Sequence, residues 1–206
     1  DIASNTTGPS NTAGQSEVRA TFEDGSAAEG NLLIGCDGIH SVTSRIIDAS
    51  APAPQYTGLI SCGGYARLPE NGASLLAPYP RSTQHLIFGK RAFFGFLVKP
   101  DGEIYWFENL AYAPKHEGKS ARGPRRSELA AIPDAEWKAR LLALHSDDQP
   151  LINAIIQATT HKLGMYPIYD IPTQPLWHKG PIALIGDAAH ATSPSAGQGA
   201  SLALED

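Results

Sequence analysis

The sequence predicts an α/β protein, α+β overall, in which the chain leaves one sheet, builds a second and mostly antiparallel sheet with helices, and then returns to the first sheet. Two short apolar runs near the two ends, 32–36 and 181–186, each finish at an aspartate. Aromatic stretches of the kind that favour strands lie between them. With 42% hydrophobic and 18% charged residues, the chain has enough apolar surface for a packed core. We therefore place the domain boundaries at 1–48, 49–165 and 166–206, and assign the first and last segments to one domain.

The first segment predicts a loop followed by three strands. Residues 1–16 are small, polar and rich in turn formers, and predict a loop or a frayed end. Apolar and polar residues alternate over 17–22 before Asp24-Gly25, which predicts a hairpin. The unbroken apolar run over 32–36 is typical of a strand buried on both faces, so we expect Cys36 to be inert core.

The middle segment predicts a sheet and two helices. Two strand-like stretches, 84–99 and 103–110, are separated by a turn at 100–102. Apolar residues at helical spacing predict helices over 133–145 and 150–159. The basic stretch within 113–127 is typical of a solvated loop, with docking of a phosphorylated cofactor as the alternative. The aromatic residues most suited to a substrate pocket are Tyr65, Phe94 and Phe96.

Composition excludes several classes of protein. The net charge of −5 argues against binding to a nucleic-acid backbone, and no apolar stretch approaches the roughly 20 residues of a membrane span. The sequence has only two cysteines, without a metal-binding spacing, which indicates a reducing compartment, and we expect a cytoplasmic protein.

The seven histidines form no metal-binding pattern. His190 with Asp187 and two nearby serines could suggest a hydrolase, but they crowd into one loop without a nucleophile elbow.

The last segment carries a specific constellation. Asp187 stands where a strand ends, so its carboxylate can face a ligand hydroxyl, and two alanines after it leave room for a bulky group. Pro194 lies in the following loop, and Gly197 and Gly199 let the chain turn tightly into a helix predicted over 200–206. The free N–H groups at such a helix start favour an anion.

Residues 185–200 resemble the second FAD-binding signature of the aromatic-hydroxylase class of flavoprotein monooxygenases, and residues 32–41 resemble the Asp-Gly signature of the same family. The resemblance implies a Rossmann-like FAD-binding domain, made of 1–48 and 166–206, around an inserted substrate domain. It also implies a fragment, because the family's N-terminal Gly-x-Gly-x-x-Gly segment and its C-terminal end are not present. One departure concerns the arginine that usually stands seven residues after the first aspartate: Ser44 occupies that position, and Arg45 follows.

By resemblance, the first signature lies near the FAD pyrophosphate and the nicotinamide cofactor, Asp187 accepts a hydrogen bond from the FAD ribityl chain, and the glycine-rich loop lines the flavin ring. The cofactor-binding residues so implied are Asp37, Gly38, Gly186, Asp187, Ala188, Pro194, Gly197, Gln198, Gly199 and Ala200. No acid, base, nucleophile or metal ligand is nominated.

The implied reaction is reduction of FAD by NADPH or NADH, followed by monooxygenation with O2 through a flavin hydroperoxide. The substrate would be a small molecule, aromatic or otherwise apolar. The alternative is a truncated, non-catalytic relative that cannot hold FAD and persists as a fragment or an interaction module. The oligomeric state stays open.

Overall fold

The computed structural model describes residues 3–4, 18–113 and 122–206. Most of the predicted loop at 1–16 and part of the basic stretch at 113–127 therefore lie outside the described residues. The chain divides into two compact units. Unit 1 comprises Asp1–Thr57 and Tyr169–Asp206, and unit 2 comprises Gly58–Ile168.

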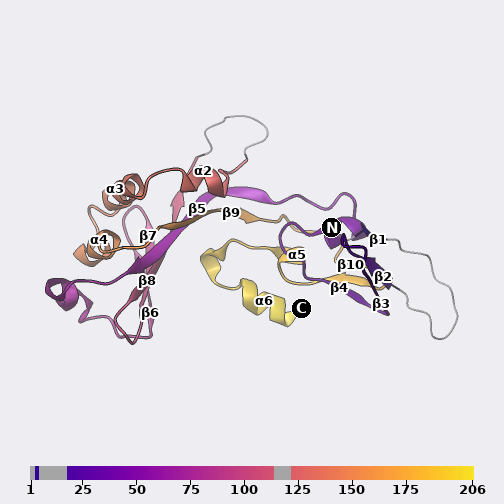
Figure 1. Cartoon of the computed structure of the whole chain (residues 1–206), viewed down its shortest axis with the longest axis horizontal. Helices are drawn as coiled ribbons and strands as arrows, with labels where there is room; N and C mark the ends of the chain where they lie inside the picture. Colours follow the sequence, from indigo (N-terminus) through magenta and orange to yellow (C-terminus); the bar gives the residue numbers. More distant parts are fainter. Residues whose placement is uncertain (1–2, 5–17, 114–121) are drawn as a thin grey trace. The chain divides into compact units, whose positions relative to one another are not determined.

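Unit 1 contains two three-stranded sheets (Figure 1). The first is antiparallel, with β1 (Ala3–Ser4), β2 (Val18–Thr21) and β3 (Ala27–Gly30) in that order, so the expectation of a loop is wrong at Ala3–Ser4. The turn between β2 and β3 contains Gly25 at φ +82°, a conformation that glycine adopts without strain, and the predicted hairpin is confirmed.

The second sheet of unit 1 has the order β10-β11-β4 and holds the two predicted apolar runs. The three strands span His178–Lys179 (β10), Ile182–Leu184 (β11) and Leu33–Gly35 (β4). The helical elements of the unit are α1 (Val42–Ile47), α5 (Asp187–His190), the 3-10 turn η2 (Pro194–Ala196) and α6 (Gly199–Glu205), which confirms the predicted C-terminal helix.

The prediction that the apolar run at 32–36 is buried on both faces is wrong. Leu32 and Ile34 are 60% and 52% exposed, whereas Leu33 packs against the core of unit 1. The described residues therefore cover only one face of β4. Cys36 lies beyond the last paired residue, Gly35, and is exposed rather than part of the core.

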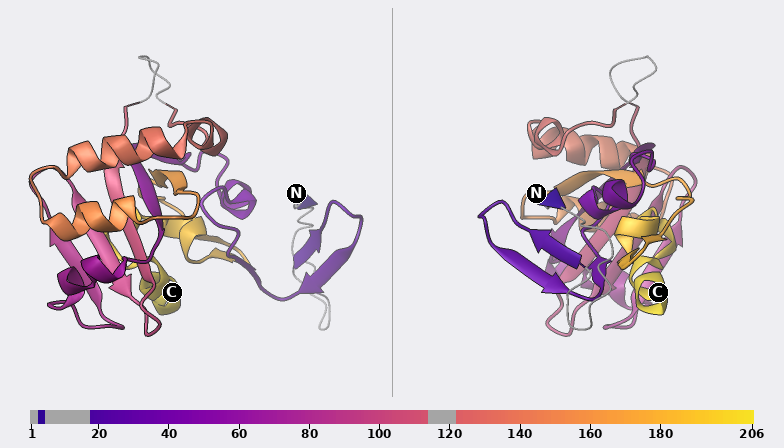
Figure 2. Two further views of the ribbon diagram at one scale, coloured as in Figure 1. Left: turned by 60° about the vertical axis from the view of Figure 1, so that its left-hand side comes forward. Right: turned by 90° about the vertical axis from the view of Figure 1, so that its right-hand side faces the viewer.

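Unit 2 is a five-stranded sheet in the order β6-β7-β8-β5-β9, with helices across one face (Figure 2). The strands span Gln84–Phe88 (β6), Phe93–Val98 (β7), Ile104–Ala111 (β8), Gln55–Ala66 (β5) and Gly164–Asp170 (β9). The helical elements are the 3-10 helix η1 (Glu70–Leu76), α2 (Arg126–Ala130), α3 (Asp134–Leu144) and α4 (Pro150–Gln157). Both predicted helices are confirmed. The expected continuous strand over 84–99 is wrong, because the chain reverses at Gly89–Ala92 and β6 pairs antiparallel with β7.

The core of unit 2 lies between the sheet and its helices. Alternate residues of β7 and β8 point into it, among them Phe94 and Trp106, whose rings stack with centroids 5.3 Å apart. Phe94 and Phe96 are fully buried there. Their assignment as pocket residues is therefore wrong, because strand parity turns them toward the helices. Tyr65 has the opposite parity and lies on the free face of the sheet, 43% exposed.

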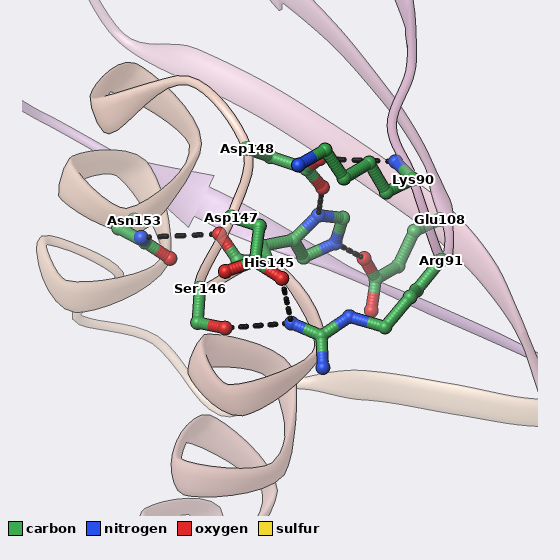
Figure 3. A network of polar contacts seen from close by, with 8 residues as sticks. All are labelled: Lys90, Arg91, Glu108, His145, Ser146, Asp147, Asp148 and Asn153. Carbon is green, nitrogen blue, oxygen red and sulfur yellow. Dashed lines mark hydrogen bonds and ion pairs between the residues drawn. The ribbon is translucent and has the colours of Figure 1, made fainter.

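A buried polar network joins the sheet to the helices of unit 2 (Figure 3). His145, at the end of α3, lies between two carboxylates. Its Nε2 is 2.6 Å from Oε2 of Glu108 on β8, and its Nδ1 is 2.8 Å from Oδ2 of Asp148. Oδ1 of Asp148 also accepts from the Lys90 N–H, 3.0 Å away. Arg91 lies alongside, 3.5 Å from Asp147. The network thus ties β8, the β6–β7 turn and the α3–α4 connection together.

The network favours a protonated His145. Burial lowers the pKa of His145, but hydrogen bonds to Glu108 and Asp148 outweigh it and raise the pKa above the ordinary value of 6.5. Burial raises the pKa of Glu108, and among the described residues only one of its two carboxylate oxygens, Oε2, has a hydrogen-bond partner. The Lys90 N–H and His145 lower the pKa of Asp148. The imidazolium is therefore the charge that makes a buried Glu108 tolerable.

We expect His145→Gln to lower the free energy of unfolding of unit 2 at pH 6 by about 3–5 kcal/mol, because Glu108 is left buried without its cationic partner. A group with a raised pKa stabilises fully below its ordinary pKa and loses that effect as pH rises through the raised value. The gap in unfolding free energy between wild type and variant should therefore narrow as the pH rises above the ordinary His145 pKa of 6.5. Urea unfolding at a series of pH values from 6 upward measures it.

Arg140→Gln is the matched control, since Arg140 pairs with Glu136 on the exposed face of the same helix. It should cost less than about 1 kcal/mol. A gap between wild type and His145→Gln that stays constant with pH would contradict a protonated His145.

Candidate cofactor-binding site

The site begins with the parallel pairing of β4 and β11. Leu33 pairs with Ile182 and Gly35 with Leu184, and the Ile185 N–H continues the ladder by donating to the Gly35 carbonyl, 3.0 Å away. Both strands therefore end at the same edge of the sheet, and each is followed by an aspartate. In α/β sheets the carboxyl ends of parallel strands are where ligands bind.

A close approach of α1 to the sheet shapes the first loop of the site. A Cβ at Gly35 would lie 2.6 Å from Cγ2 of Thr43 and 3.0 Å from Cδ2 of Leu184. Only glycine fits between the two strands and the helix here. This requirement explains why an otherwise apolar run is interrupted at its last paired residue.

Asp37 caps α1. Its carboxylate accepts four hydrogen bonds, from the hydroxyls of Ser41 and Thr43 and from the N–H groups of Val42 and Thr43. Burial raises the pKa of Asp37, but the hydrogen bonds from Ser41, Thr43 and Val42 outweigh it and hold the pKa below its ordinary value. Gly38 follows at φ +76°, which turns the chain out of the strand. The carboxylate thus organises this loop from within.

Asp187 is arranged in the opposite way. Gly186, at φ +58° and ψ −142°, turns the chain from β11 into α5, whose first residue is Asp187. The Asp187 side chain is exposed, and within the described part of the chain no hydrogen bond or ion pair engages it. Ala188 is fully buried beneath it. A free carboxylate at a strand end, on a rigid turn, is available to a ligand hydroxyl.

The glycine-rich loop has open space beside its main chain. Ser193 caps η2 through Ser195, and Gly197 then adopts φ +63° before α6 begins. A Cβ at Gly197 or Gly199 would meet nothing within 4 Å. Packing therefore requires glycine at neither position. The positive φ of Gly197 favours glycine there, whereas Gly199 has no such requirement.

Asp206, at the end of α6, connects that helix to the turn at Gly186 and Asp187. Its carboxylate accepts from the Gly186 N–H at 2.6 Å and lies 2.8 Å from Nε2 of His190. These two contacts lower the pKa of Asp206. A Cβ at Gly186 would lie 3.2 Å from that of Ala203 on α6, so the helix packs closely on the turn.

The structure places every sequence-predicted site residue in unit 1. Asp37 and Gly38 follow β4, and Gly186, Asp187 and Ala188 follow β11. The glycine-rich loop contributes Pro194, Gly197, Gln198, Gly199 and Ala200, all exposed except the half-buried Gly199. Sequence reasoning missed Gln174 and Asp206, because single polar residues outside a motif give no local pattern.

The structure removes the hydrolase interpretation. His190 contacts Asp206 rather than Asp187, and the hydroxyl oxygens of Ser193 and Ser195 lie 2.9 Å from each other. Over the described ranges, no cluster of three or more histidine, cysteine or acidic side chains could hold a metal ion. No helix in the same ranges has the length and apolar character of a membrane span.

Comparison with known proteins agrees with this site. The profile of a family described as FAD binding domain matches residues 122–206. The FAD-dependent urate hydroxylase of Klebsiella oxytoca is 32% identical over 190 residues, which cover 92% of this chain and 44% of the hydroxylase. The similarity to an FAD-dependent hydroxylase therefore extends over most of this chain.

Further relatives show the same similarity. The 6-hydroxynicotinate 3-monooxygenase of Bordetella bronchiseptica is 29% identical, over 92% of this chain and 45% of that enzyme. The crystal structure of Klebsiella pneumoniae HpxO complexed with FAD and uric acid superposes with a TM-score of 0.68 at 26% identity, over 91% of this chain and 43% of HpxO. These matches confirm the resemblance to FAD-dependent hydroxylases and the mixed α/β fold. The chain spans less than half the length of these relatives.

We expect Asp37→Ala to destabilise unit 1 by about 1–2 kcal/mol, because α1 loses its capping carboxylate. Since the pKa of Asp37 is lowered, its stabilisation is present above its ordinary pKa of 3.8 and is lost as pH falls through the lowered value. Thermal unfolding at pH 7 and at pH 3 measures both effects. An equal loss on Asp187→Ala, whose carboxylate has no described partner, would contradict the capping role.

Proposed function

We propose that this chain supplies part of the FAD site of a monooxygenase that oxidises a small aromatic substrate, with NADPH or NADH as electron donor and O2 as the oxygen source. The observation that carries the proposal is the parallel pairing of β4 with β11. It sets the free Asp187 carboxylate and the Asp37 loop at one edge of the sheet. Two family signatures far apart in the sequence thereby form one surface.

The residues at this edge fit a flavin dinucleotide. A ribityl hydroxyl needs an acceptor, and the exposed Asp187 carboxylate provides one. A flat ring system needs main chain without projecting side chains, and the open space beside Gly197 and Gly199 meets that need. The buried, small Ala188 keeps the turn close to the sheet. The neighbouring exposed residues Pro194, Gln198 and Ala200 would line the ring.

Each segment then has a separate task. Bound FAD supplies the transfer of electrons from the nicotinamide cofactor to O2 and the delivery of one oxygen atom to the substrate. Asp187 orients the ribityl chain by a charge-assisted hydrogen bond. Asp37 acts indirectly: it holds the turn at Gly38 near the pyrophosphate and the nicotinamide cofactor. None of these residues transfers a proton in this proposal.

Unit 2 offers a separate surface for the substrate. A hollow of about 220 Å³ in unit 2 is lined by four aromatic side chains together with Gly63, Gly64 and Lys162. The four aromatic residues are Tyr65, Tyr105, Phe107 and Tyr166. The Tyr65 and Tyr105 rings lie 5.3 Å apart, and the Tyr105 and Phe107 rings 5.9 Å apart.

The chemistry of this hollow favours a small planar ring. Aromatic side chains bind such rings by stacking and edge contacts. Uric acid and 6-hydroxynicotinate, which appear in the names of two relatives, are planar heteroaromatic molecules of this kind. We propose a substrate of the same class, without choosing one.

We expect Asp187→Ala in the native full-length protein to raise the dissociation constant of FAD about tenfold or more, because a charge-assisted hydrogen bond of roughly 1.5–3 kcal/mol is lost. Gly199→Ala should have a comparable effect, because its methyl group would stand between the flavin ring and the main chain. Titration of the apoprotein with FAD, followed by flavin fluorescence, measures both constants.

Gly30→Ala is the control for the second variant. Gly30 ends β3, has ordinary space for a methyl group and lies outside both signatures. It should leave the FAD dissociation constant unchanged. Unchanged FAD affinity in both Asp187→Ala and Gly199→Ala would refute the site.

We expect Tyr166→Ala to raise the KM for an aromatic substrate about two- to tenfold with FAD affinity unchanged, because one ring contact of about 0.5–1.5 kcal/mol is lost. Phe88→Ala is the matched control, since Phe88 is 81% exposed on β6 and does not line the hollow. Steady-state kinetics of both variants make the comparison. Equal effects of the two substitutions would argue against the hollow as the substrate site.

A further inference from the structure

Gln174 is a buried polar residue that no signature contains. It lies between β9 and β10, is 5% exposed, and belongs to unit 1. Its side-chain oxygen accepts from the Ser44 hydroxyl at 2.8 Å. Its side-chain nitrogen donates to the carbonyls of Ala188 and Ala189 at 2.8 and 2.9 Å. Because carbonyls only accept, the amide nitrogen must face α5, and the orientation of the side chain is fixed.

These three hydrogen bonds join the two segments of the proposed FAD site. Ser44 lies in α1, the helix that Asp37 caps, and Ala188 and Ala189 lie in α5, the helix that Asp187 begins. An α-helix as short as α5 leaves its carbonyls without partners of its own. Gln174 supplies a donor to two of them and anchors the same side chain on α1.

The identity of residue 44 makes this arrangement possible. Ser44 has a short side chain and is 7% exposed. Its hydroxyl is within hydrogen-bond distance of the Gln174 side-chain oxygen. The neighbouring Arg45 turns back to the carbonyls of Ser41 and His40, so it does not connect α1 to α5.

We propose that Gln174 is a positioning residue of the FAD site, which sets the Asp187 carboxylate relative to the Asp37 loop by holding α5 against α1. This inference rests on the proposed function. Among the described residues, the hydrogen bonds of the Gln174 side chain go to Ser44, Ala188 and Ala189 and to no residue of the glycine-rich loop. Gln174 would therefore act on FAD only through the turn at Asp187. Its contribution to FAD affinity should therefore depend on the Asp187 carboxylate being present.

A double-mutant cycle on FAD affinity tests this dependence. The dissociation constant of FAD is measured by flavin fluorescence for the native full-length protein and for Gln174→Leu, Asp187→Ala and the double variant. We expect Gln174→Leu to weaken FAD binding at least tenfold in the wild-type background and less than threefold in the Asp187→Ala background. Residues that act through one contact give such non-additive effects.

Two further variants separate positioning from general loss of stability. Ser44→Ala removes one of the three hydrogen bonds and leaves both bonds to α5, so it should weaken FAD binding less than Gln174→Leu. Val18→Ala removes buried side-chain volume from the core of the same unit, outside both segments, and should leave FAD affinity within about twofold. A tenfold loss in Val18→Ala would overturn the inference, because instability alone would then explain Gln174→Leu.

The outcomes distinguish the two proposals. Additive effects of Gln174→Leu and Asp187→Ala, or no effect of Gln174→Leu, would overturn the positioning role while the FAD site stands. A wild-type protein that binds no FAD would overturn the proposed function itself. Strong coupling in the cycle supports both.

Discussion

The site depends on one constraint, the parallel pairing of β4 with β11. Parallel strands cannot be joined by a tight turn, so the chain must travel away and come back, and unit 2 is the segment inserted between them. The return brings Asp187 to the sheet edge that Asp37 already occupies. The two carboxylates then serve different purposes. The Asp37 carboxylate accepts hydrogen bonds from the first N–H groups of α1, whereas the Asp187 carboxylate is exposed. A single strand pair thus creates both the frame of the site and its free acceptor.

Both units use a buried polar side chain to connect elements that apolar packing alone would leave free to slide. In unit 2, His145 joins β8 to the α3–α4 connection through Glu108 and Asp148. In unit 1, Gln174 joins α1 to α5. The two solutions differ in charge. The neutral amide keeps its three hydrogen bonds at any pH, whereas the connection through His145 depends on a proton.

Much of the fold and the location of the candidate site could be predicted from the sequence, because signatures and periodicity are local. The α3 and α4 helices, the hairpin at Gly25 and the strands ending before Asp37 and Asp187 all have local patterns. Burial could not be predicted in the same way. The run at 32–36 is apolar throughout, yet Ile34 is exposed, since coverage depends on what packs across the sheet. The parity that buries Phe94 is set by pairing with β8, and Gln174 is recognisable only once distant segments meet.

The four internal hydrogen bonds of the Asp37 carboxylate have a consequence for the thermodynamics of ligand capture. A loop that is ordered by its own cap before any ligand arrives loses little conformational entropy on binding. The contacts with a dinucleotide would then contribute to affinity without being offset by the cost of ordering the loop. Binding at this edge should accordingly resemble docking onto a rigid surface, with association limited by encounter rather than by rearrangement of the loop.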